Sequence, residues 1–219
     1  MEAAPHIDRL KALPSAAVSD ALDALGLPGS IQGLSRRATD SVVAGRAFTV
    51  RYEEAGDEAG TVGDFLDDVP AGDVVVIDNS GRTDCTTWGG IMSRVAAMRA
   101  VAGTVVHGAC RDVSTSSEAG YPIWSSGVFM RTGKDRVRCA EVQGELLIDG
   151  VGVHPGDFVL ADADGVVVVP QSVIGEVLDL AEHIETTEDK IVADVQAGSR
   201  LVESRERFQY HTLQRAVAP

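Results

Sequence analysis

The sequence predicts a single α/β domain, on three observations. An apolar run at residues 73–78 is followed by a small-residue segment at 90–102 and a second apolar run at 104–107. A strand, a helix and a strand joined by short links form a parallel pair with a right-handed crossover. Several short apolar runs between residues 122 and 169, separated by turns, predict a compact antiparallel half. The 219 residues, 44% of them hydrophobic, suffice for one full core, and no linker divides them.

Composition and charge argue against several kinds of partner. The formal net charge of −14 is unsuited to nucleic acid, because phosphate binding needs clustered Lys and Arg. No apolar run approaches the length of a membrane span, and the first residues lack the basic and apolar segments of a secretory signal. Cys85, Cys110 and Cys139 form no CxxC pair, which is typical of reduced thiols. We therefore expect a cytoplasmic protein.

The first quarter of the chain predicts helices and then a strand. Residues 7–25 carry apolar side chains at helical spacing, interrupted at Pro14, so we expect a turn and then a helix from about Ser15. Gly26 and Pro28 end that helix. Residues 47–52 (AFTVRY) are β-branched and aromatic, as in a strand.

The next stretch leads to a second, buried strand. Residues 61–66 predict a short helix, and residues 73–78 (DVVVID) are a continuous apolar run typical of a strand buried on both faces. Asn79, Ser80 and Gly81 then form a turn, and residues 82–87 a polar loop.

The segment from Trp88 to Val113 (WGGIMSRVAAMRAVAGTVVHGACRDV) is the predicted functional centre. It reads as a glycine turn, a helix from Gly90, a buried strand, and a loop that delivers Arg111 and Asp112. A Gly-Gly turn leaves the N–H groups of the first helical turn open for an anion. Ligands of parallel sheets bind beyond the carboxyl ends of the strands, where the turn at 79–81 and the Arg-Asp pair lie.

An adjacent cation and carboxylate offer one group for a substrate oxyanion and one for a metal. The alternative is a structural ion pair, since charged pairs near strand ends are usually solvated. The same holds for the acidic run Glu182, Glu185, Glu188 and Asp189, which predicts a solvated helix face. One of these carboxylates could nevertheless reach a site across a subunit boundary.

The last third predicts short strands followed by a long helix. We expect the strands at 122–130, 140–142, 145–148, 151–153, 158–161 and 166–169, with a hairpin turn at Asp149-Gly150. Pro170 ends this region, and Ser172 is predicted to cap an acidic helix that runs to about Gln196. Residues 201–219 carry Phe208, Tyr210 and Leu213, which we expect to pack on a neighbouring subunit.

Several catalytic motifs are absent from the sequence. The histidines show no HExxH spacing, there is no GxSxG elbow, and no glycine-rich loop continues into Gly-Lys-Ser/Thr. Cys110 has no His placed in sequence to activate it, so a buried structural thiol is favoured over a nucleophile.

The central segment resembles the core of the RraA-like family, which includes the 4-hydroxy-4-methyl-2-oxoglutarate (4-carboxy-4-hydroxy-2-oxoadipate) aldolases. The resemblance extends over most of the chain, through SDALDALGLPGS, AGRAFTV, GDVVVIDNSG, VGVHPGDFVLADADGVVVVP and TTEDKIVADVQAG. It implies a three-layer β/β/α sandwich of the swivelling-domain type, a single domain over residues 1–219. It also implies homotrimers or dimers of trimers with sites between subunits, and residues 171–219 are expected at such an interface.

The resemblance further implies a class II lyase that uses Mg²⁺ or Mn²⁺ to cleave a C–C bond of a small 2-oxo acid. Asp112 matches the residue that binds the metal, and Arg111 the residue that contacts the pyruvate-like part of the substrate. The amides of Gly90, Ile91 and Met92 match those that hold its carboxylate. A glutamate from a neighbouring subunit approaches the metal in such enzymes, and Glu188 is the nearest match, with Glu185 second.

One departure from the family pattern concerns Gly90. Aldolase members carry an acidic residue here, so this chain lacks a candidate orienter of the base that retro-aldol cleavage needs. Decarboxylation of oxaloacetate needs only groups that stabilise the enolate. We therefore expect this chain to retain oxaloacetate decarboxylation more readily than aldol cleavage.

Two other roles are attached to such sequences. The alternative function is a non-catalytic, RraA-type regulator that binds and inhibits a ribonuclease. Such members look to lack the Asp of the Arg-Asp pair, which this chain keeps, so the enzyme is favoured. A methyltransferase role has no support, since the chain has no glycine-rich loop for a methyl donor.

Overall fold

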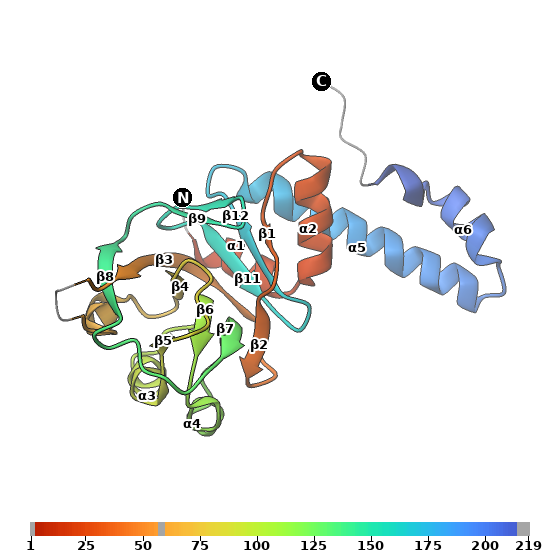
Figure 1. Ribbon diagram of the computed structural model, residues 1–219. Helices are drawn as coiled ribbons and strands as arrows, with labels where there is room; N and C mark the ends of the chain where they lie inside the picture. Colours follow the sequence, from red (N-terminus) through yellow and green to blue (C-terminus); the bar gives the residue numbers. More distant parts are fainter. Residues whose placement is uncertain (1–2, 57–59, 214–219) are drawn as a thin grey trace.

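A curled, mixed sheet forms the centre of the molecule (Figure 1). The computed structural model describes residues 3–56 and 60–213. The strand order is β1-β12-β11-β3-β4-β6-β7-β2, β5 pairs with β6 and β8 with β3, and β9 and β10 form a separate hairpin. The strands are β1 Ser30–Ile31, β2 Ser35–Ala38, β3 Val43–Glu54, β4 Val74–Asp78, β5 Thr86–Trp88, β6 Gly103–Cys110, β7 Ile123–Val128, β8 Val137–Val142, β9 Leu146–Ile148, β10 Val151–Val153, β11 Phe158–Ala161 and β12 Val166–Val169.

Strand β3 joins the two halves of this sheet. Its first residues pair antiparallel with β11, and from Ala47 onward it pairs parallel with β4. Strand β8 takes over the edge that β11 leaves, from Val50 onward. A Cβ atom on Gly45 would lie 2.4 Å from the carbonyl oxygen of Gly72, so only glycine lets the two segments come this close.

Helices cover both outer faces of the curled sheet. α1 (Ala4–Lys11), α2 (Ser15–Ala24) and α5 (Ile174–Gln196) pack on the antiparallel half, whereas α3 (Gly90–Met98), α4 (Val113–Glu118) and the 3₁₀ helix η1 (Asp64–Asp68) pack on the parallel half (Figure 1). Successive side chains of a strand point to opposite faces of the sheet. One set therefore packs against the helices outside, and the other set forms a third core inside the curl. In β11, Phe158 and Leu160 face α2 and α5, while Val159 and Ala161 face the interior.

The predicted α/β fold class is confirmed, with the parallel strand, helix and strand at its centre. The hairpin at Asp149-Gly150 and the helix from Ser15 are confirmed as well. The short strands β1, β2 and β5 and helix α4 were not predicted.

Three further expectations need correction. β7 was expected in an antiparallel half, yet it pairs antiparallel with β2 on one side and parallel with β6 on the other, because its run of side chains does not encode its partner. β6 continues three residues beyond His107, so Cys110 lies in the strand and the loop begins at Arg111. Ser172 does not cap α5, whose N-cap residue is Val173 and has no side-chain cap.

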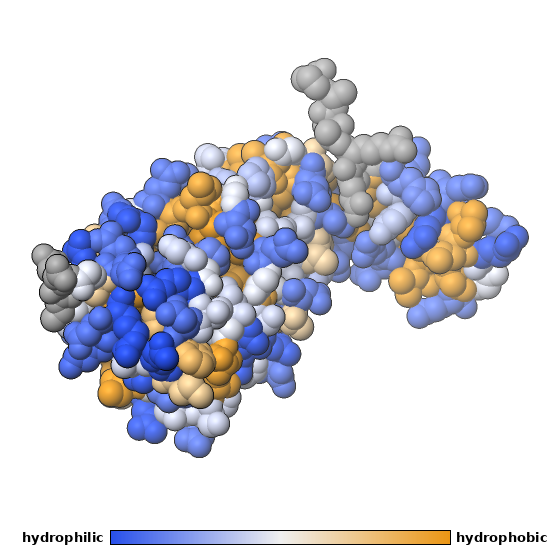
Figure 2. Space-filling model, viewed as in Figure 1, coloured by the Kyte–Doolittle hydropathy of each residue, from blue (hydrophilic) through white to orange (hydrophobic). Residues whose placement is uncertain are grey.

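Helix α5 extends from the body as an arm, and α6 (Leu201–Arg207) folds back on it (Figure 1). Asp194 anchors the turn by pairing with Ser204 and Arg207. Val192, Leu201 and Val202 are exposed there, and Figure 2 shows apolar surface on this arm. Packing of residues 171–219 on a neighbour stays a prediction, and residues 214–219 lie outside the described part. In that part, every helix is too short or too polar to cross a membrane.

A histidine in β6 joins the β9–β10 hairpin to the end of β4. His107 Nδ1 lies 2.8 Å from Asp78 Oδ1, and its Nε2 lies 3.7 Å from Asp149 Oδ1 in the hairpin turn. The hydrogen bond to Asp78 and the nearby carboxylates raise the pKa of His107 above its usual value, against the opposing effect of burial.

This raised pKa predicts a pH-dependent stability. The charged His107 stabilises the folded state fully below the unfolded pKa of ~6.5, and this contribution is lost as pH rises through the higher folded pKa. His107→Gln is expected to cost about 1.5–3 kcal/mol at pH 6, typical of a hydrogen bond to a charged group, and less at pH 8.5. Urea unfolding at both pH values measures this; an equal cost at the two would contradict it.

Candidate functional site

A cavity of about 200 Å³ opens at the carboxyl ends of β5 and β6, beside the first turn of α3. It brings together all five residues predicted from the central segment: Gly90, Ile91, Met92, Arg111 and Asp112. The turn at Asn79 does not line it, although it follows a neighbouring strand. The cavity is lined by Val62, Thr86, Trp88, Gly89, Gly90, Ile91, Met92, Arg111, Asp112 and Thr132.

The backbone places the Arg-Asp pair at the end of β6. The Arg111 N–H donates to the carbonyl of Trp88 at 3.0 Å, which joins β6 to the end of β5. Asp112 then adopts a left-handed conformation (φ 57°, ψ 40°), which Asp tolerates better than most residues. Its carbonyl accepts the Ser116 N–H at 3.0 Å and so starts α4.

The Asp112 carboxylate is held by α3. Its Oδ2 accepts the Gly90 N–H at 2.9 Å, whereas Arg111 Nε lies 3.7 Å from the same oxygen, beyond hydrogen-bond distance. The two side chains are 47% and 38% exposed. Arg111 and Asp112 therefore form an ion pair without a hydrogen bond, and a structural ion pair remains the alternative to a functional role.

The first turn of α3 leaves two amides available to an anion. The Gly90 N–H is engaged by Asp112, and the Ser93 N–H donates to the Gly89 carbonyl at 3.0 Å. Ile91 and Met92 occupy the positions between them, and their N–H groups have no partner in residues 3–56 and 60–213. Of the three amides predicted to hold a carboxylate, these two remain open in this structure.

The two glycines allow α3 to approach the Arg-Asp loop closely. A Cβ on Gly89 would lie 3.1 Å from both Arg111 Nε and Asp112 Oδ2. A Cβ on Gly90 would lie 3.0 Å from Thr115 Cγ2, on α4. Gly90 therefore marks the place where α3 and α4 touch, and a larger residue there requires Thr115 to move.

Four other lining residues were missed by the sequence reasoning: Val62, Thr86, Trp88 and Thr132. Thr132 reaches the cavity because it forms a parallel bridge with Thr86, whose Oγ1 donates to the Arg131 carbonyl at 3.1 Å. The pattern of residues 129–136 does not predict this pairing. The only feature that could have pointed to this segment was its high density of positively charged residues.

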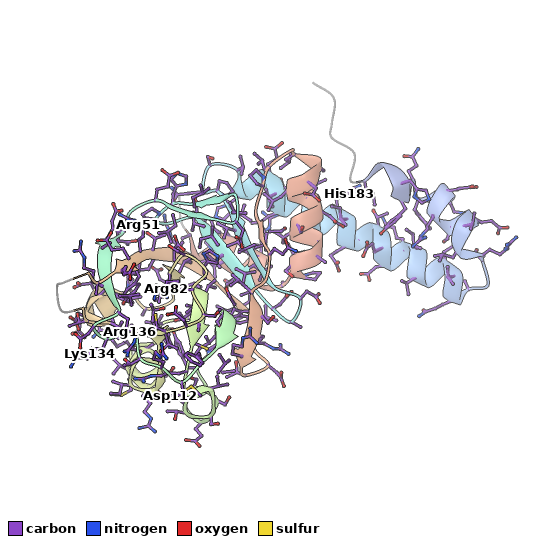
Figure 3. All side chains as sticks on the ribbon, viewed as in Figure 1. Arg51, Arg82, Asp112, Lys134, Arg136 and His183 are labelled. Atoms are coloured by element: carbon purple, nitrogen blue, oxygen red, sulfur yellow. The ribbon has the colours of Figure 1, made fainter. Side chains whose placement is uncertain are left out.

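The loop around Thr132 is cationic. Arg131 lies over the Phe129 ring, and Arg136 donates to the carbonyls of Thr132 and Lys134. None of Arg131, Lys134 and Arg136 forms an ion pair with a carboxylate of the described residues. Figure 3 shows Lys134, Arg136 and Asp112 on the same side of the molecule. Positive charge in this acidic protein thus gathers next to the cavity.

A divalent cation would find one carboxylate in this cavity. Asp112 is its only acidic lining residue, and the described residues contain no group of three or more His, Cys, Asp or Glu that could hold a metal. Mg²⁺ commonly binds through one or two carboxylates and keeps several waters, so the donor set fits such an ion. The Oδ1 atom of Asp112 has no hydrogen-bond partner in the described part of the chain.

Glu188, the predicted second ligand, does not line the cavity. It lies on the α5 arm, where its Oε1 accepts the Tyr210 hydroxyl at 3.3 Å. Figure 3 shows His183 of the same helix far across the view from Asp112. Burial, with the nearby Glu188 and Asp189, raises the pKa of Glu185. One chain therefore does not bring Glu188 to Asp112, and its contribution from a neighbour stays a prediction.

The glycine contact yields a test of the local packing. Gly90→Glu is expected to destabilise the fold by about 1–3 kcal/mol, because its Cβ would lie 3.0 Å from Thr115 Cγ2 and either Thr115 or α3 must shift to admit it. Gly175→Ala is the control, because nothing lies within 4 Å of that Cβ, so it should be neutral or stabilise α5. Thermal unfolding of both variants measures this; Gly90→Glu as stable as Gly175→Ala would refute the contact.

Comparisons with known proteins agree with this architecture. The chain is 39% identical to a protein of Pseudomonas syringae whose crystal structure superposes with a TM-score of 0.85, covering 92% of this chain and 96% of that one. It is 28% identical, with a TM-score of 0.75, to a Streptomyces coelicolor protein described as an unusual member of the RNase ES inhibitor RraA family, covering 84% and 94% of the two chains.

Curated relatives point to the same group. Protein DlpA of Legionella pneumophila is 38% identical over 199 residues, which are 90% of this chain but 32% of DlpA, so this chain spans about a third of that relative. A 4-hydroxy-4-methyl-2-oxoglutarate aldolase of Thermus thermophilus is 35% identical over 132 residues, 58% of this chain and 76% of that protein. The RraA-like (aldolase/RraA) family model matches residues 15–168, and the chain belongs to this family.

Proposed function

We propose that this protein is a divalent-metal-dependent lyase that cleaves a C–C bond of a small 2-oxo acid through a pyruvate enolate. One observation carries the proposal: a single cavity holds a carboxylate that accepts the Gly90 N–H, a guanidinium that pairs with this carboxylate at 3.7 Å without a hydrogen bond, and two open helix amides. The aldolase named among the relatives supports the same reaction class.

Each group has a distinct task in binding a 2-oxo acid. The N–H groups of Ile91 and Met92, at the positive end of α3, donate hydrogen bonds to the substrate carboxylate. Arg111 faces the 2-oxo group and stabilises the negative charge that develops on it. Asp112 holds Mg²⁺ or Mn²⁺, which when bound supplies Lewis-acid polarisation of the 2-oxo group.

The chemistry of oxaloacetate cleavage suits these residues. When the C3–C4 bond breaks, its electron pair enters the C2–C3 bond, and the negative charge moves to the oxygen beside Arg111. Carbon dioxide leaves, and protonation of C3 gives pyruvate. The chain's residues need to supply charge stabilisation and no proton abstraction, so the absence of an acid at Gly90 does not impair this route.

The cationic loop favours a substrate with a second anionic group. Arg131, Lys134 and Arg136 flank Thr132, which lines the cavity, and Lys134 and Arg136 form no ion pair with a carboxylate of the described residues. A carboxylate on the distal carbon of the substrate would meet this positive charge at the mouth. Dicarboxylic 2-oxo acids, such as oxaloacetate and 4-hydroxy-4-methyl-2-oxoglutarate, carry such a group.

We also propose that the active assembly is a homotrimer or dimer of trimers in the cytoplasm. The exposed apolar residues of the α5–α6 arm support an interface there. In such an assembly the arm of one subunit brings Glu188 towards the metal of its neighbour.

A second candidate function is binding and inhibition of a ribonuclease, supported by the likeness to the Streptomyces coelicolor RraA-family protein. Inhibition of a ribonuclease would not require the Asp112 carboxylate to be held in a cavity. Lyase activity in the following tests separates the two candidates.

Metal dependence is the first test of the lyase. We expect the protein with Mg²⁺ or Mn²⁺ to release pyruvate from oxaloacetate faster than the free metal does, and EDTA to abolish the enzymatic rate. Pyruvate is measured over a panel that includes 4-hydroxy-4-methyl-2-oxoglutarate. Folded, Mg²⁺-loaded protein that leaves oxaloacetate at the background rate would rule out the decarboxylase.

The role of Asp112 is tested by substitution. Asp112→Ala is expected to lower kcat/KM for oxaloacetate by about 100-fold or more, because the metal and its charge stabilisation are lost together. Asp164→Ala is a control on an exposed turn carboxylate outside the cavity. Equal activity of the Asp112 variant and the unmodified protein would show that the metal role is wrong.

A further inference from the structure

Two buried serines lie beneath the cavity, where α3 meets α4. Ser93 Oγ and Ser116 Oγ are 2.7 Å apart, and both side chains are fully buried. Ser93 lies on α3 and Ser116 on α4, so this contact joins the two helices that carry the site. Neither residue lines the cavity.

The hydroxyl pair belongs to a longer hydrogen-bonded chain with two possible directions. The Trp88 indole N–H can only donate, and it donates to Ser93 Oγ at 3.0 Å. Ser93 then donates to Ser116, and Ser116 to the Asp112 carbonyl at 3.3 Å. In the reverse order, Ser116 donates to Ser93, and Ser93 to the Gly89 carbonyl at 3.2 Å. Either direction ends on a peptide group of the cavity wall.

The residue above this chain needs such support. Asp112 is in the left-handed region, which costs a non-glycine residue free energy and persists where its surroundings fix it. Its carboxylate is tied to α3 by the Gly90 N–H, and its carbonyl contacts Ser116. A small rotation of α4 against α3 would turn the carboxylate away from the cavity.

We propose that Ser93 and Ser116 are positioning residues that fix the backbone of Asp112 and aim its carboxylate at the bound divalent cation. The inference rests on the proposed function, because it needs a metal at Asp112. Groups that orient a ligand without touching the metal typically change affinity or activity 10- to 100-fold. The two hydroxyls act as one unit, since each needs the other to complete the chain.

The test measures Mn²⁺ affinity directly, by counting free Mn²⁺ with electron paramagnetic resonance. Ser116→Ala is expected to raise the Kd for Mn²⁺ about tenfold. Ser93→Ala, on the other helix, should do the same, and serves alone if the first variant does not fold. The double variant should be no weaker than the weaker single variant, because either change breaks the same chain.

Ser125→Ala is the matched control. Ser125 is also a fully buried serine with hydrogen bonds, to Arg37 and the Gly127 carbonyl, and it does not contact Asp112. Its loss should lower stability while leaving the Mn²⁺ affinity unchanged. Asp112→Asn identifies the metal site, since it should abolish most of the binding.

The outcomes separate the two hypotheses. The proposed function fails if the unmodified protein binds no Mn²⁺, or if Asp112→Asn binds Mn²⁺ as tightly as the unmodified protein. The positioning role then fails as well. If Asp112→Asn loses affinity while folded Ser116→Ala and Ser93→Ala match Ser125→Ala, the serines are merely structural and the positioning role is overturned. A tenfold loss confined to the two network variants supports it.

Discussion

The hydrogen bond from the Gly90 N–H to Asp112 Oδ2 is the contact on which the site depends. It joins the start of α3, which lines the cavity, to the turn between β6 and α4, so it couples these two helices. A bond from an N–H group to a carboxylate is stronger than a neutral one, and the helix N-terminus adds its own positive potential. The same contact uses one amide and one carboxylate oxygen, which leaves the other oxygen and the next two amides for ligands.

Close approach of the backbone makes this contact possible. Gly89 and Gly90 present no Cβ where Arg111, Asp112 and Thr115 already lie. The left-handed Asp112 then turns its carboxylate back towards α3 instead of continuing along the strand. The surface hydrogen bond and the buried serine pair hold the same helix junction from two sides.

Local sequence patterns predicted those parts of the site that are formed by neighbouring residues in the chain. The apolar run before Arg111 and the Gly-Gly turn indicated a strand end and a helix start, and both proved to border one cavity. Contacts between distant segments were beyond such rules. The pairing of Thr86 with Thr132, and the packing of Gly90 on Thr115, leave no trace in either segment alone. α4 was missed because VSTSSE has no apolar periodicity, and its N-cap residue Asp112 forms no side-chain cap hydrogen bond.

The glycine at position 90 also shapes the chemistry that the site can perform. In the sequence alone it read as the loss of a carboxylate that aldolase members of the family carry. In the structure a Cβ at this position would lie 3.0 Å from Thr115 Cγ2 on α4, so a side chain there requires Thr115 to shift. The shift would occur beside the amide that holds Asp112. This chain thus has no proton-transfer group at position 90, while it keeps the carboxylate, the guanidinium and the amides. Under the proposed lyase function, such a site would stabilise an enolate well and assist removal of a hydroxyl proton poorly, which favours substrates whose departing fragment needs no base.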